Sequence, residues 1–247
     1  HCRSFIALCV SEIPMYRFVT FVLLPIIVSA EPAIHNDAHY KVDGLTAPAE
    51  IIVDDWGVPH IYAQNHYDAF FVQGFNAARD RLWQIDLWRK RGLGQLSATF
   101  GAKYLQQDEA ARLFLYRGEM YSEWLAYGND AKRVAQVFTL GINAYIALTE
   151  QNENLLPPEF HLLNYRPQRW QPEDVVRIRS NGLWRNITNE VWRAHMACAN
   201  RLEEAGRWKQ LEPAWQTRIP RGLDPCVIPT NVLSKYKLAK APVRFDN

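Results

Sequence analysis

Hydrophobic residues spaced three and four apart predict a long helix in the first half of the chain. Between Tyr67 and Arg91 they recur on one helical face, at Phe70, Phe71, Gly74, Phe75, Ala78, Leu82, Ile85 and Trp88. Asn65 precedes this run and is a favoured residue type at a helix N-cap, and Asp68 adds negative charge to the first turn. Gly92 follows Arg91, where a glycine is typical of a helix C-terminus. The pattern therefore predicts a helix over 67–91.

Similar patterns predict helices along most of the remaining chain. The predicted ranges are 93–100, 108–117, 121–125, 131–149, 171–184 and 189–207. Pro157 and Pro158 are expected to break the chain, and the Pro-rich tail from Pro213 is expected to be irregular. Upstream, two short runs flank the turn 56–59, in which Gly57 permits a positive φ. The expected fold class is mainly α with a small β-hairpin near residues 50–63.

The first thirty residues have the pattern of a targeting segment. The first methionine is Met15, Arg17 is basic, and an apolar run extends from Phe18 to Ala30. This order is typical of a secretory signal peptide, and the run is shorter than the roughly 20 residues that span a bilayer. We therefore expect a periplasmic or secreted protein, with an uncleaved membrane anchor as the alternative. The expected divisions are an upstream or non-native segment (1–14), a signal peptide (15–30), a lead-in (31–48), a helical domain (49–225) and a tail or linker (226–247).

Composition and charge narrow the function classes. Of the 247 residues 48% are hydrophobic, which is enough to form a core, and the formal net charge of +2 gives no electrostatic reason to expect nucleic acid as a partner. Cleavage after Ala30 would leave Cys198 and Cys226, which export would permit to pair, although their spacing does not decide it. No His/Cys cluster indicates a structural zinc site.

Several segments, in the same order and with compatible gaps, resemble the first part of penicillin acylase precursors. The segments are Asp55-Trp56-Gly57-Val58-Pro59-His60-Ile61-Tyr62-Ala63, the run from Gly74 to Leu87 with Arg89 and Gly94-Gln95-Leu96, Leu156-Pro157-Pro158-Glu159-Phe160, Trp170-Gln171-Pro172-Glu173-Asp174, and Val232-Leu233 with Tyr236, Leu238 and Ala239. The resemblance covers roughly residues 49–247. Each segment alone is a weak signal of this family, but their common order makes the combination specific.

The resemblance implies an N-terminal-nucleophile hydrolase of the αββα fold. In this family an exported precursor cuts itself into a small α chain and a large β chain, whose new N-terminal residue is usually a serine. The α-amino group of that serine serves as base, since such a group titrates near neutrality. The reaction is hydrolysis of a linear amide between an acyl group and an amine. The substrate would be a small N-acyl compound, with penicillins, acyl-homoserine lactones and lipopeptides all open.

The nucleophile that this family uses is not expected in the present chain. The string Ser180-Asn181-Gly182-Leu183-Trp184 has part of a processing pattern, but Arg179 stands where a glycine is expected. The string also lies within the predicted helix 171–184, and cleavage there would leave too short a β chain to form the family's sheets. We therefore predict no catalytic residue here. The chain is interpreted as signal peptide plus α-chain portion of a truncated precursor, inactive alone, with the β chain as its partner.

The α chain of this family contributes one wall of the acyl pocket and a calcium ligand. By alignment with that stretch, Leu183 and Trp184 are the candidates for the wall, and Arg185 could take this role if the register shifts; both apolar residues could instead be buried core. Glu190 is the candidate calcium ligand. Calcium needs 6–8 oxygens, so the others are expected from the β chain. An ordinary ion pair of Glu190 with Arg193 or Arg185 is the alternative.

Other conspicuous residues are interpreted as structural. His60 has no accompanying nucleophile pattern and is expected to be a structural histidine. Asp86 and Lys90 are spaced to pair on one helix. Trp83 and Trp88 are expected to be core or interface anchors. Two further hypotheses for the whole chain stay open: a non-catalytic helical binding or scaffolding module from a degenerate acylase gene, and a membrane-tethered helical protein.

Overall fold

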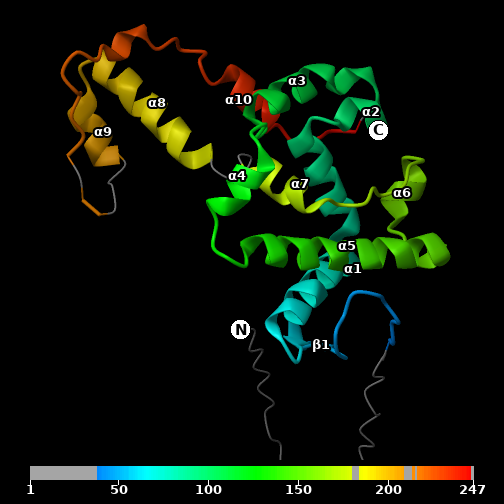
Figure 1. Cartoon of the computed structure of the whole chain (residues 1–247). Helices are drawn as coiled ribbons and strands as arrows, with labels where there is room; N and C mark the ends of the chain where they lie inside the picture. Colours follow the sequence, from blue (N-terminus) through cyan, green and yellow to red (C-terminus); the bar gives the residue numbers. More distant parts are fainter. Residues whose placement is uncertain (1–37, 180–183, 209–212, 215, 246–247) are drawn as a thin grey trace, which may run out of the picture. The chain divides into compact units, whose positions relative to one another are not determined.

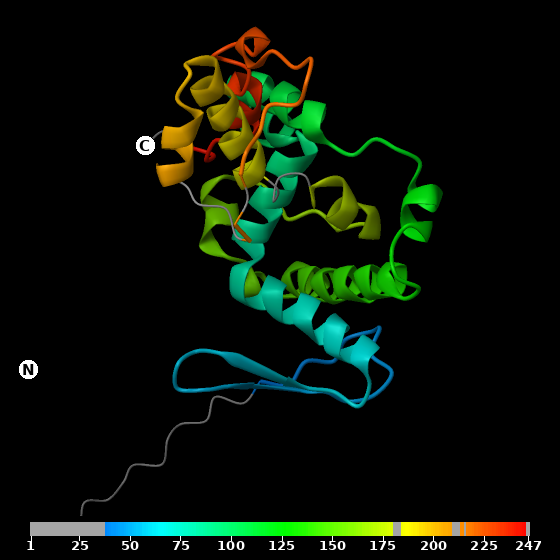
Figure 2. The ribbon, with the colours of Figure 1, turned by 90° about the vertical axis from the view of Figure 1, so that its left-hand side faces the viewer.

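The structure is a computed structural model that describes residues 38–179, 184–208, 213–214 and 216–245. Strands β1 (Glu50–Val53) and β2 (Pro59–Tyr62) form an antiparallel hairpin in which Ile52 lies opposite His60 (Figure 2). The helices are α1 (His66–Leu93), α2 (Leu96–Phe100), α3 (Leu105–Phe114), α4 (Met120–Leu125), α5 (Ala131–Gln151), α6 (Pro158–Leu162), α7 (Pro172–Arg177), α8 (Trp184–Cys198), α9 (Leu202–Trp208) and α10 (Ser234–Ala239) (Figure 1). Short 3-10 turns are η1 (Ala102–Tyr104), η2 (Glu153–Leu155) and η4 (Pro225–Val227). The mainly helical fold with a small hairpin is confirmed.

The core forms where α1 crosses α5 (Figure 1). Two glycines allow the two backbones to meet: a Cβ built on Gly74 would lie 2.0 Å from the carbonyl oxygen of Phe138, and one on Gly141 would lie 1.9 Å from that of Phe71. Around this crossing the buried residues Phe75, Ala78, Leu82, Ile142, Tyr145, Ile146, Leu156, Phe160 and Trp170 form one cluster. The three-and-four spacing predicted for 67–91 and 131–149 therefore marks two helical faces that pack on each other.

The start of α1 is fixed by the residues that the sequence predicted. Asn65 is the N-cap, since its side-chain oxygen accepts a hydrogen bond from the backbone N–H of Asp68 at 2.9 Å. Asp68 is buried, and its carboxylate accepts hydrogen bonds from the backbone N–H and hydroxyl of Thr46 and from the backbone N–H of Ala47. These bonds lower the pKa of Asp68 against the opposing effect of desolvation. They tie the segment before the hairpin to the first turn of α1.

The predicted end of this helix is wrong by two residues. Gly92 lies inside α1 and is buried, and Gly94 is the residue with left-handed φ (65°) that caps the helix. A side chain at Gly94 would collide with the backbone oxygen of Asp108 at 2.8 Å, so the close approach of α3 also requires a glycine here. As a result, α2 begins at Leu96 rather than at residue 93. Within α1 the helical geometry is interrupted at Arg81, whose φ is −145°.

Other predicted boundaries also differ from the structure; for example, the helix predicted over 108–117 is α3, which spans Leu105–Phe114. Pro158 does not break the chain but begins α6, because a proline is tolerated at the first helical position. The helix predicted over 171–184 ends at Arg177. The range 189–207 divides into α8 and α9 at Asn200, which has a φ of 56°. The tail contains α10, whose Tyr236 and Ala239 are buried and whose Tyr236 ring contacts Phe114 of α3, so tertiary packing forms a helix that the Pro-rich composition argued against.

Two buried ion pairs involve α1: one joins it to α7, and the other lies within α1 itself. Nε of Arg89 donates to Oδ2 of Asp174 at 2.7 Å, and Nζ of Lys90 lies 3.6 Å from Asp86. The predicted Asp86–Lys90 pair is thus confirmed, although both side chains are buried rather than on the surface. Tyr165 donates its hydroxyl hydrogen to Asp86 at 3.3 Å. Burial raises the pKa of Asp86 and lowers that of Lys90, which is the cost of placing a charged pair in the core.

The two tryptophans predicted as anchors differ in environment. Trp83 packs against the core edge-on to Phe160, with ring centroids 5.6 Å apart, whereas Trp88 is half exposed. In the part of the chain that the structure describes, no helix combines the length and the apolar character needed to cross a bilayer. The predicted segments 1–14 and 15–30 lie outside the described residues.

Candidate functional site

The chain that leads into the predicted pocket wall is held by contacts to α4 and to the residues on either side of it. Tyr116 and Arg177 bond reciprocally: the backbone N–H of Tyr116 donates to the carbonyl of Arg177, and the Arg177 guanidinium donates to the carbonyl of Tyr116. Two residues on, the guanidinium of Arg179 lies over the rings of Tyr116 and Tyr127 and pairs with Glu123. These contacts fix the direction in which the chain leaves α7.

The predicted wall residues follow directly after this anchored segment. Leu183 lies outside the described residues, whereas Trp184 and Arg185 belong by their backbone to the first turn of α8. The structure therefore places the two described members on adjacent positions of one helix start. Their role against a substrate stays a prediction.

Glu190 lies one to two turns further along α8 and pairs with Arg193. Nη1 of Arg193 donates to Oε1 of Glu190 at 2.7 Å, while the Arg193 side chain is buried and that of Glu190 is more than half exposed. The ion pair that the sequence offered as an alternative is thus present. Across residues 38–179 and the other described ranges, no three His, Cys, Asp or Glu side chains come together to hold a metal. Any calcium at Glu190 would need most of its ligands from elsewhere.

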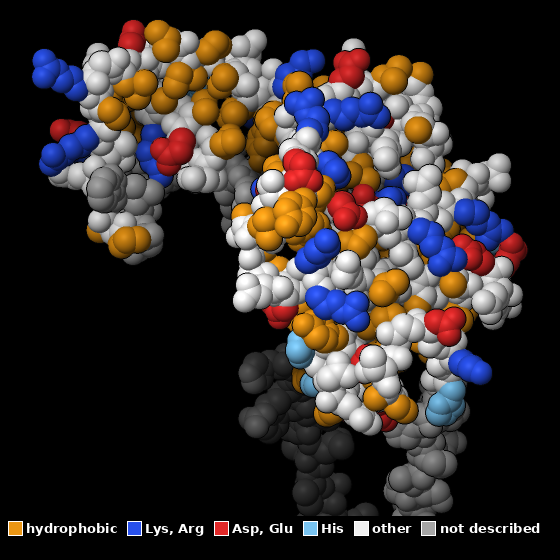
Figure 3. Space-filling model, viewed as in Figure 1, with side chains coloured by type: hydrophobic (Ala, Val, Ile, Leu, Met, Phe, Trp, Pro, Cys, Tyr) orange, Lys and Arg blue, Asp and Glu red, His pale blue; other side chains and the backbone are white. Residues whose placement is uncertain are grey.

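A disulfide fixes the far end of α8. Cys198, the last residue of the helix, is bonded to Cys226 in η4, which settles the pairing that spacing left open. Hydrophobic side chains gather over α8 and the segment that leads to η4 in the space-filling view (Figure 3). Ile187, Leu223 and Val227 are among the exposed ones. This helix therefore joins the predicted site residues to an apolar surface.

A second organised feature is the turn of the hairpin, which carries the first resemblance segment. Asp54 accepts hydrogen bonds on Oδ1 from the backbone N–H groups of Trp56 and Val58, both at 2.9 Å, and its Oδ2 lies 2.9 Å from Nε2 of His60. The hydrogen bond from His60 is the main cause that lowers the pKa of Asp54. His60 therefore contributes to the structure of the turn.

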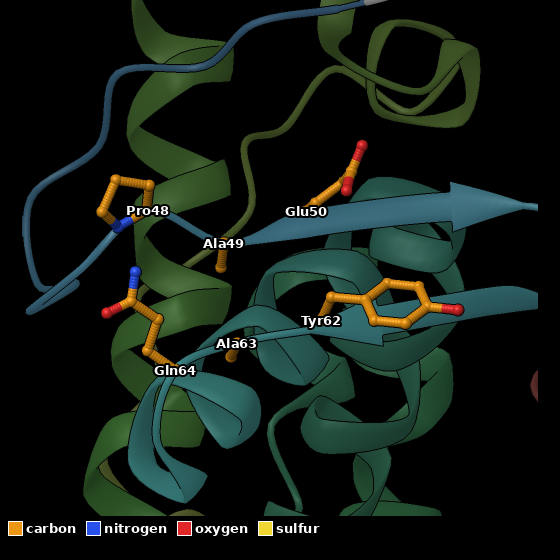
Figure 4. Close-up of a pocket in the computed structure, with 6 residues that line it drawn as sticks. All are labelled: Pro48, Ala49, Glu50, Tyr62, Ala63 and Gln64. Atoms are coloured by element: carbon orange, nitrogen blue, oxygen red, sulfur yellow. The ribbon is translucent and has the colours of Figure 1, made fainter.

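A shallow hollow of about 380 Å³ lies at the base of this hairpin (Figure 4). Its floor contains Ala49 and Ala63, while Glu50 and Tyr62 stand on one side and Pro48 and Gln64 on the other. Glu50 and Tyr62 are cross-strand partners. The polar groups of the lining are the Glu50 carboxylate, the Tyr62 hydroxyl and the Gln64 amide.

Sequence reasoning missed two residues that organise these features. The sequence pattern places Asp54 in the short run before the turn 56–59 and predicts no role for its side chain. An aspartate just before a turn is a common acceptor for the following backbone N–H groups, so the sequence does contain a signal for this role. Arg179 was considered only as the residue that spoils a processing pattern. Its contacts join positions 116, 123, 127 and 179, and no local pattern relates residues so far apart in sequence.

Comparison with known proteins gives the family context for these features. The family model described as penicillin amidase matches residues 48–223. Penicillin acylase 2 proenzyme of Pseudomonas sp. (strain SE83) is 31% identical over 68% of this chain and 22% of its own length. Penicillin G acylase of Escherichia coli is 30% identical over 52% of this chain and 15% of its own. The acyl-homoserine lactone acylase QuiP of Pseudomonas aeruginosa (strain PAO1) is 28% identical over 61% and 18%.

A solved structure adds a likeness in fold. One chain of the thermostable penicillin G acylase from Alcaligenes faecalis superposes with a TM-score of 0.52 at 23% identity, over 71% of this chain and 98% of that chain. The present chain spans about a fifth of the length of the curated relatives it matches. It spans nearly all of the solved chain, which is therefore itself a short polypeptide.

Proposed function

Since the chain belongs to the penicillin amidase family, we propose that it is the small-chain portion of an acylase that hydrolyses a linear amide between an acyl group and an amine. The observation that carries this proposal is the family match over 48–223 in a chain that spans only 22% of the penicillin acylase 2 proenzyme. The near-complete coverage of one short acylase chain supports the same division.

In this proposal the attacking group lies in the remainder of the enzyme. That remainder supplies a serine at its N-terminus, whose α-amino group accepts the hydroxyl proton, and completes an αββα fold. The present residues would shape and close the acyl-binding side. Export precedes this assembly, with 15–30 as signal peptide and the periplasm or the exterior as destination, where the Cys198–Cys226 bond is stable.

The acyl group of the substrate would lie against the start of α8. Leu183 and Trp184 offer an apolar side chain and an indole, and Arg185 offers a cation if the register differs by one residue. Support for this placement comes from the clamp of Arg177 and Arg179, since a pocket wall needs a fixed approach of the chain that carries it. Penicillins and acyl-homoserine lactones both remain candidate substrates, because relatives of both names match.

Calcium is proposed to bind at Glu190 with ligands from the other part of the enzyme. The carboxylate is a hard oxygen donor and is more than half exposed, which fits this role. Its present partner, Arg193, competes with a cation for the same oxygen, so the site is incomplete in this chain. A calcium ion there would neutralise charge and join the two parts of the enzyme.

The function is tested with the longer polypeptide translated through the reading frame downstream of Asn247. We expect the purified product to release amine from penicillin G, from an N-acyl-homoserine lactone or from another N-acyl compound in a panel that varies the acyl group. Replacing Trp184 by alanine should change the selectivity among the acyl groups of the panel, because KM for the preferred acyl group should change. An immediate stop codon, or a folded product that hydrolyses no amide, would favour a non-catalytic helical module instead.

The calcium proposal predicts a change in metal content. In the same longer polypeptide, Glu190→Gln is expected to lower bound calcium from about one ion per molecule to well below that, because a neutral amide oxygen is a weaker ligand. Metal content after dialysis, measured by atomic emission, is the readout. Glu204→Gln, which removes another helical carboxylate paired with an arginine, is the matched control and should leave the content unchanged. Equal calcium in both variants would show that Glu190 is not a ligand.

A further inference from the structure

The Cys198–Cys226 disulfide lies at the surface of the chain. Both cysteines are exposed, Cys198 as the last residue of α8 and Cys226 in the middle of η4. The bond joins two positions that are 28 residues apart in sequence, with α9 between them (Figure 1). Thiols in solution reach an exposed disulfide, and exposed disulfides are reduced more readily than buried ones. The bond is therefore open to chemical control.

Little apolar packing holds this part of the chain together. Among the described side chains of α8, α9 and η4, only Arg193 and Ala205 are buried. By contrast, the crossing of α1 and α5 buries a whole cluster of large apolar residues around Phe75 and Ile146. Burial of apolar surface is the main source of folding stability, so α8, α9 and η4 gain little from it. The covalent bond is thus the strongest link between α8 and η4.

The helix that this bond holds carries the residues proposed for the site. Trp184 and Arg185 lie in the first turn of α8, Glu190 lies further along it, and Cys198 ends it. The helix packs chiefly on η4 and α9. Its buried side chain, Arg193, donates to Glu190 of the same helix. The state of the disulfide therefore affects the proposed pocket wall and the proposed calcium ligand together.

Reduction of the bond would remove the constraint that favours the ordered form of α8. A cross-link over 28 positions limits the conformations of the disordered segment, and this entropy effect is lost when the bond opens. The helix has 15 residues, and isolated helices of about 12–15 residues are marginally stable in water. We therefore expect α8 to open frequently in the reduced chain, while the well-packed helices α1 and α5 stay folded.

We propose that the Cys198–Cys226 bond is a redox-controlled lock, which orders α8 only when the bond is oxidised. This inference rests on the proposed function, because it takes the role of α8 from it. The reductant is a dithiol. One thiolate of the dithiol attacks Sγ of Cys226 and releases the Cys198 thiolate, and the second thiolate then displaces Cys226 from the mixed disulfide. The dithiol becomes a disulfide, and the two cysteines gain two electrons and two protons.

The lock makes completion of the site depend on export. Cytoplasmic thiols are kept reduced, whereas disulfides form and persist in the periplasm and outside the cell. Before export, α8 is therefore unlocked, and neither the proposed wall nor Glu190 is held in place. After export, oxidation joins the end of α8 to η4. An amide-hydrolysing site thereby stays incomplete inside the cell, where other N-acyl compounds are present.

Hydrogen–deuterium exchange of the purified 247-residue chain tests the lock. After reduction with dithiothreitol, the amides of α8 are expected to exchange at least about 10-fold faster, whereas those of α1 and α5 should change less than about twofold. The double variant Cys198→Ser, Cys226→Ser is the matched control. It should exchange like the reduced chain and should not respond to dithiothreitol. It keeps Cys2 and Cys9, so reduction of these residues affects both proteins alike.

Two results of this experiment would overturn the lock. Equal exchange of α8 in the oxidised and the reduced chain would show that packing alone holds the helix. Loss of protection in α1 and α5 together with α8 would show that the bond stabilises the whole fold and has no separate effect on α8.

A second measurement connects the lock to the proposed site. In the longer polypeptide, reduction is expected to raise KM for the preferred N-acyl substrate about 10-fold, because the wall is no longer held in place. The double variant should show this higher KM with and without dithiothreitol. An unchanged KM with faster exchange of α8 would overturn the effect of the lock on the site, while the proposed function stands. Redox-dependent exchange of α8 without any amide hydrolysis by the oxidised product would contradict the function and retain the lock.

Discussion

Replacing Gly141 by alanine is expected to lower the free energy of unfolding by about 3 kcal/mol or more. The added Cβ would lie 1.9 Å from the carbonyl oxygen of Phe71 and 2.8 Å from the backbone nitrogen of Phe75. Both atoms belong to the backbone of α1, so no side-chain rotation can relieve the contact. The two helices would have to separate and open the core cluster between them. Urea unfolding of the chain followed by circular dichroism measures this change.

Gly206 provides a matched control for this substitution. It also lies in a helix, α9, but a Cβ there meets nothing within 4 Å. Gly206→Ala is expected to stabilise the chain slightly, by about 0.5–1 kcal/mol at most, because alanine restricts the unfolded chain. If Gly141→Ala unfolded at the same urea concentration as the unsubstituted chain, the close crossing of α1 and α5 would be wrong.

Replacing Asp174 by alanine is expected to lower the free energy of unfolding by about 3–5 kcal/mol. Oδ2 of Asp174 accepts hydrogen bonds from Nε of Arg89 at 2.7 Å and from the backbone N–H of Gln171 at 3.0 Å. In Asp174→Ala the guanidinium of Arg89 would stay buried without its counter-ion, and the start of α7 would lose a capping acceptor. The free energy of unfolding in urea is again the measurement.

The comparison pair for this prediction is Glu150 with Arg169, whose oxygen and nitrogen lie 2.6 Å apart. Both side chains are about half exposed, so water and salt screen their attraction. Glu150→Ala should therefore lower the free energy of unfolding by only about 0–1 kcal/mol. Asp174→Asn keeps an acceptor for the start of α7. Its loss in free energy of unfolding should therefore lie between the losses of Glu150→Ala and Asp174→Ala. Similar losses for Asp174→Ala and Glu150→Ala would show that the Arg89 pair is not buried in solution.

The helical faces and the hairpin could be predicted because they depend on local patterns. The spacing of apolar residues over 67–91 and 131–149 identified the two helices that form the core. The helix stop at Gly94 could not be chosen over Gly92 in the same way, because the choice depends on the approach of α3, far away in sequence. The tail helix α10 likewise depends on burial of Tyr236 against α3.

The candidate site was predictable only as far as the family resemblance extends. The resemblance proposes Trp184, Arg185 and Glu190 as site residues, and the structure shows that all three belong to one helix. It also includes the hairpin turn among its segments. It did not explain why Asp54 and Gly57 belong to that turn, which becomes clear from the hydrogen bonds that hold Trp56 outward. The clamp of Arg179 needs the folded positions of α4 and α7 and is invisible to local patterns.

In the proposed function, these residues form one side of an acylase whose attacking group lies in another part of the polypeptide. The most direct test is the release of amine from a chromogenic N-acyl substrate by the purified 247-residue chain, compared with the longer polypeptide under the same conditions. We expect background hydrolysis for the chain alone and turnover for the longer product. Catalytic turnover by the chain alone would contradict the proposed function.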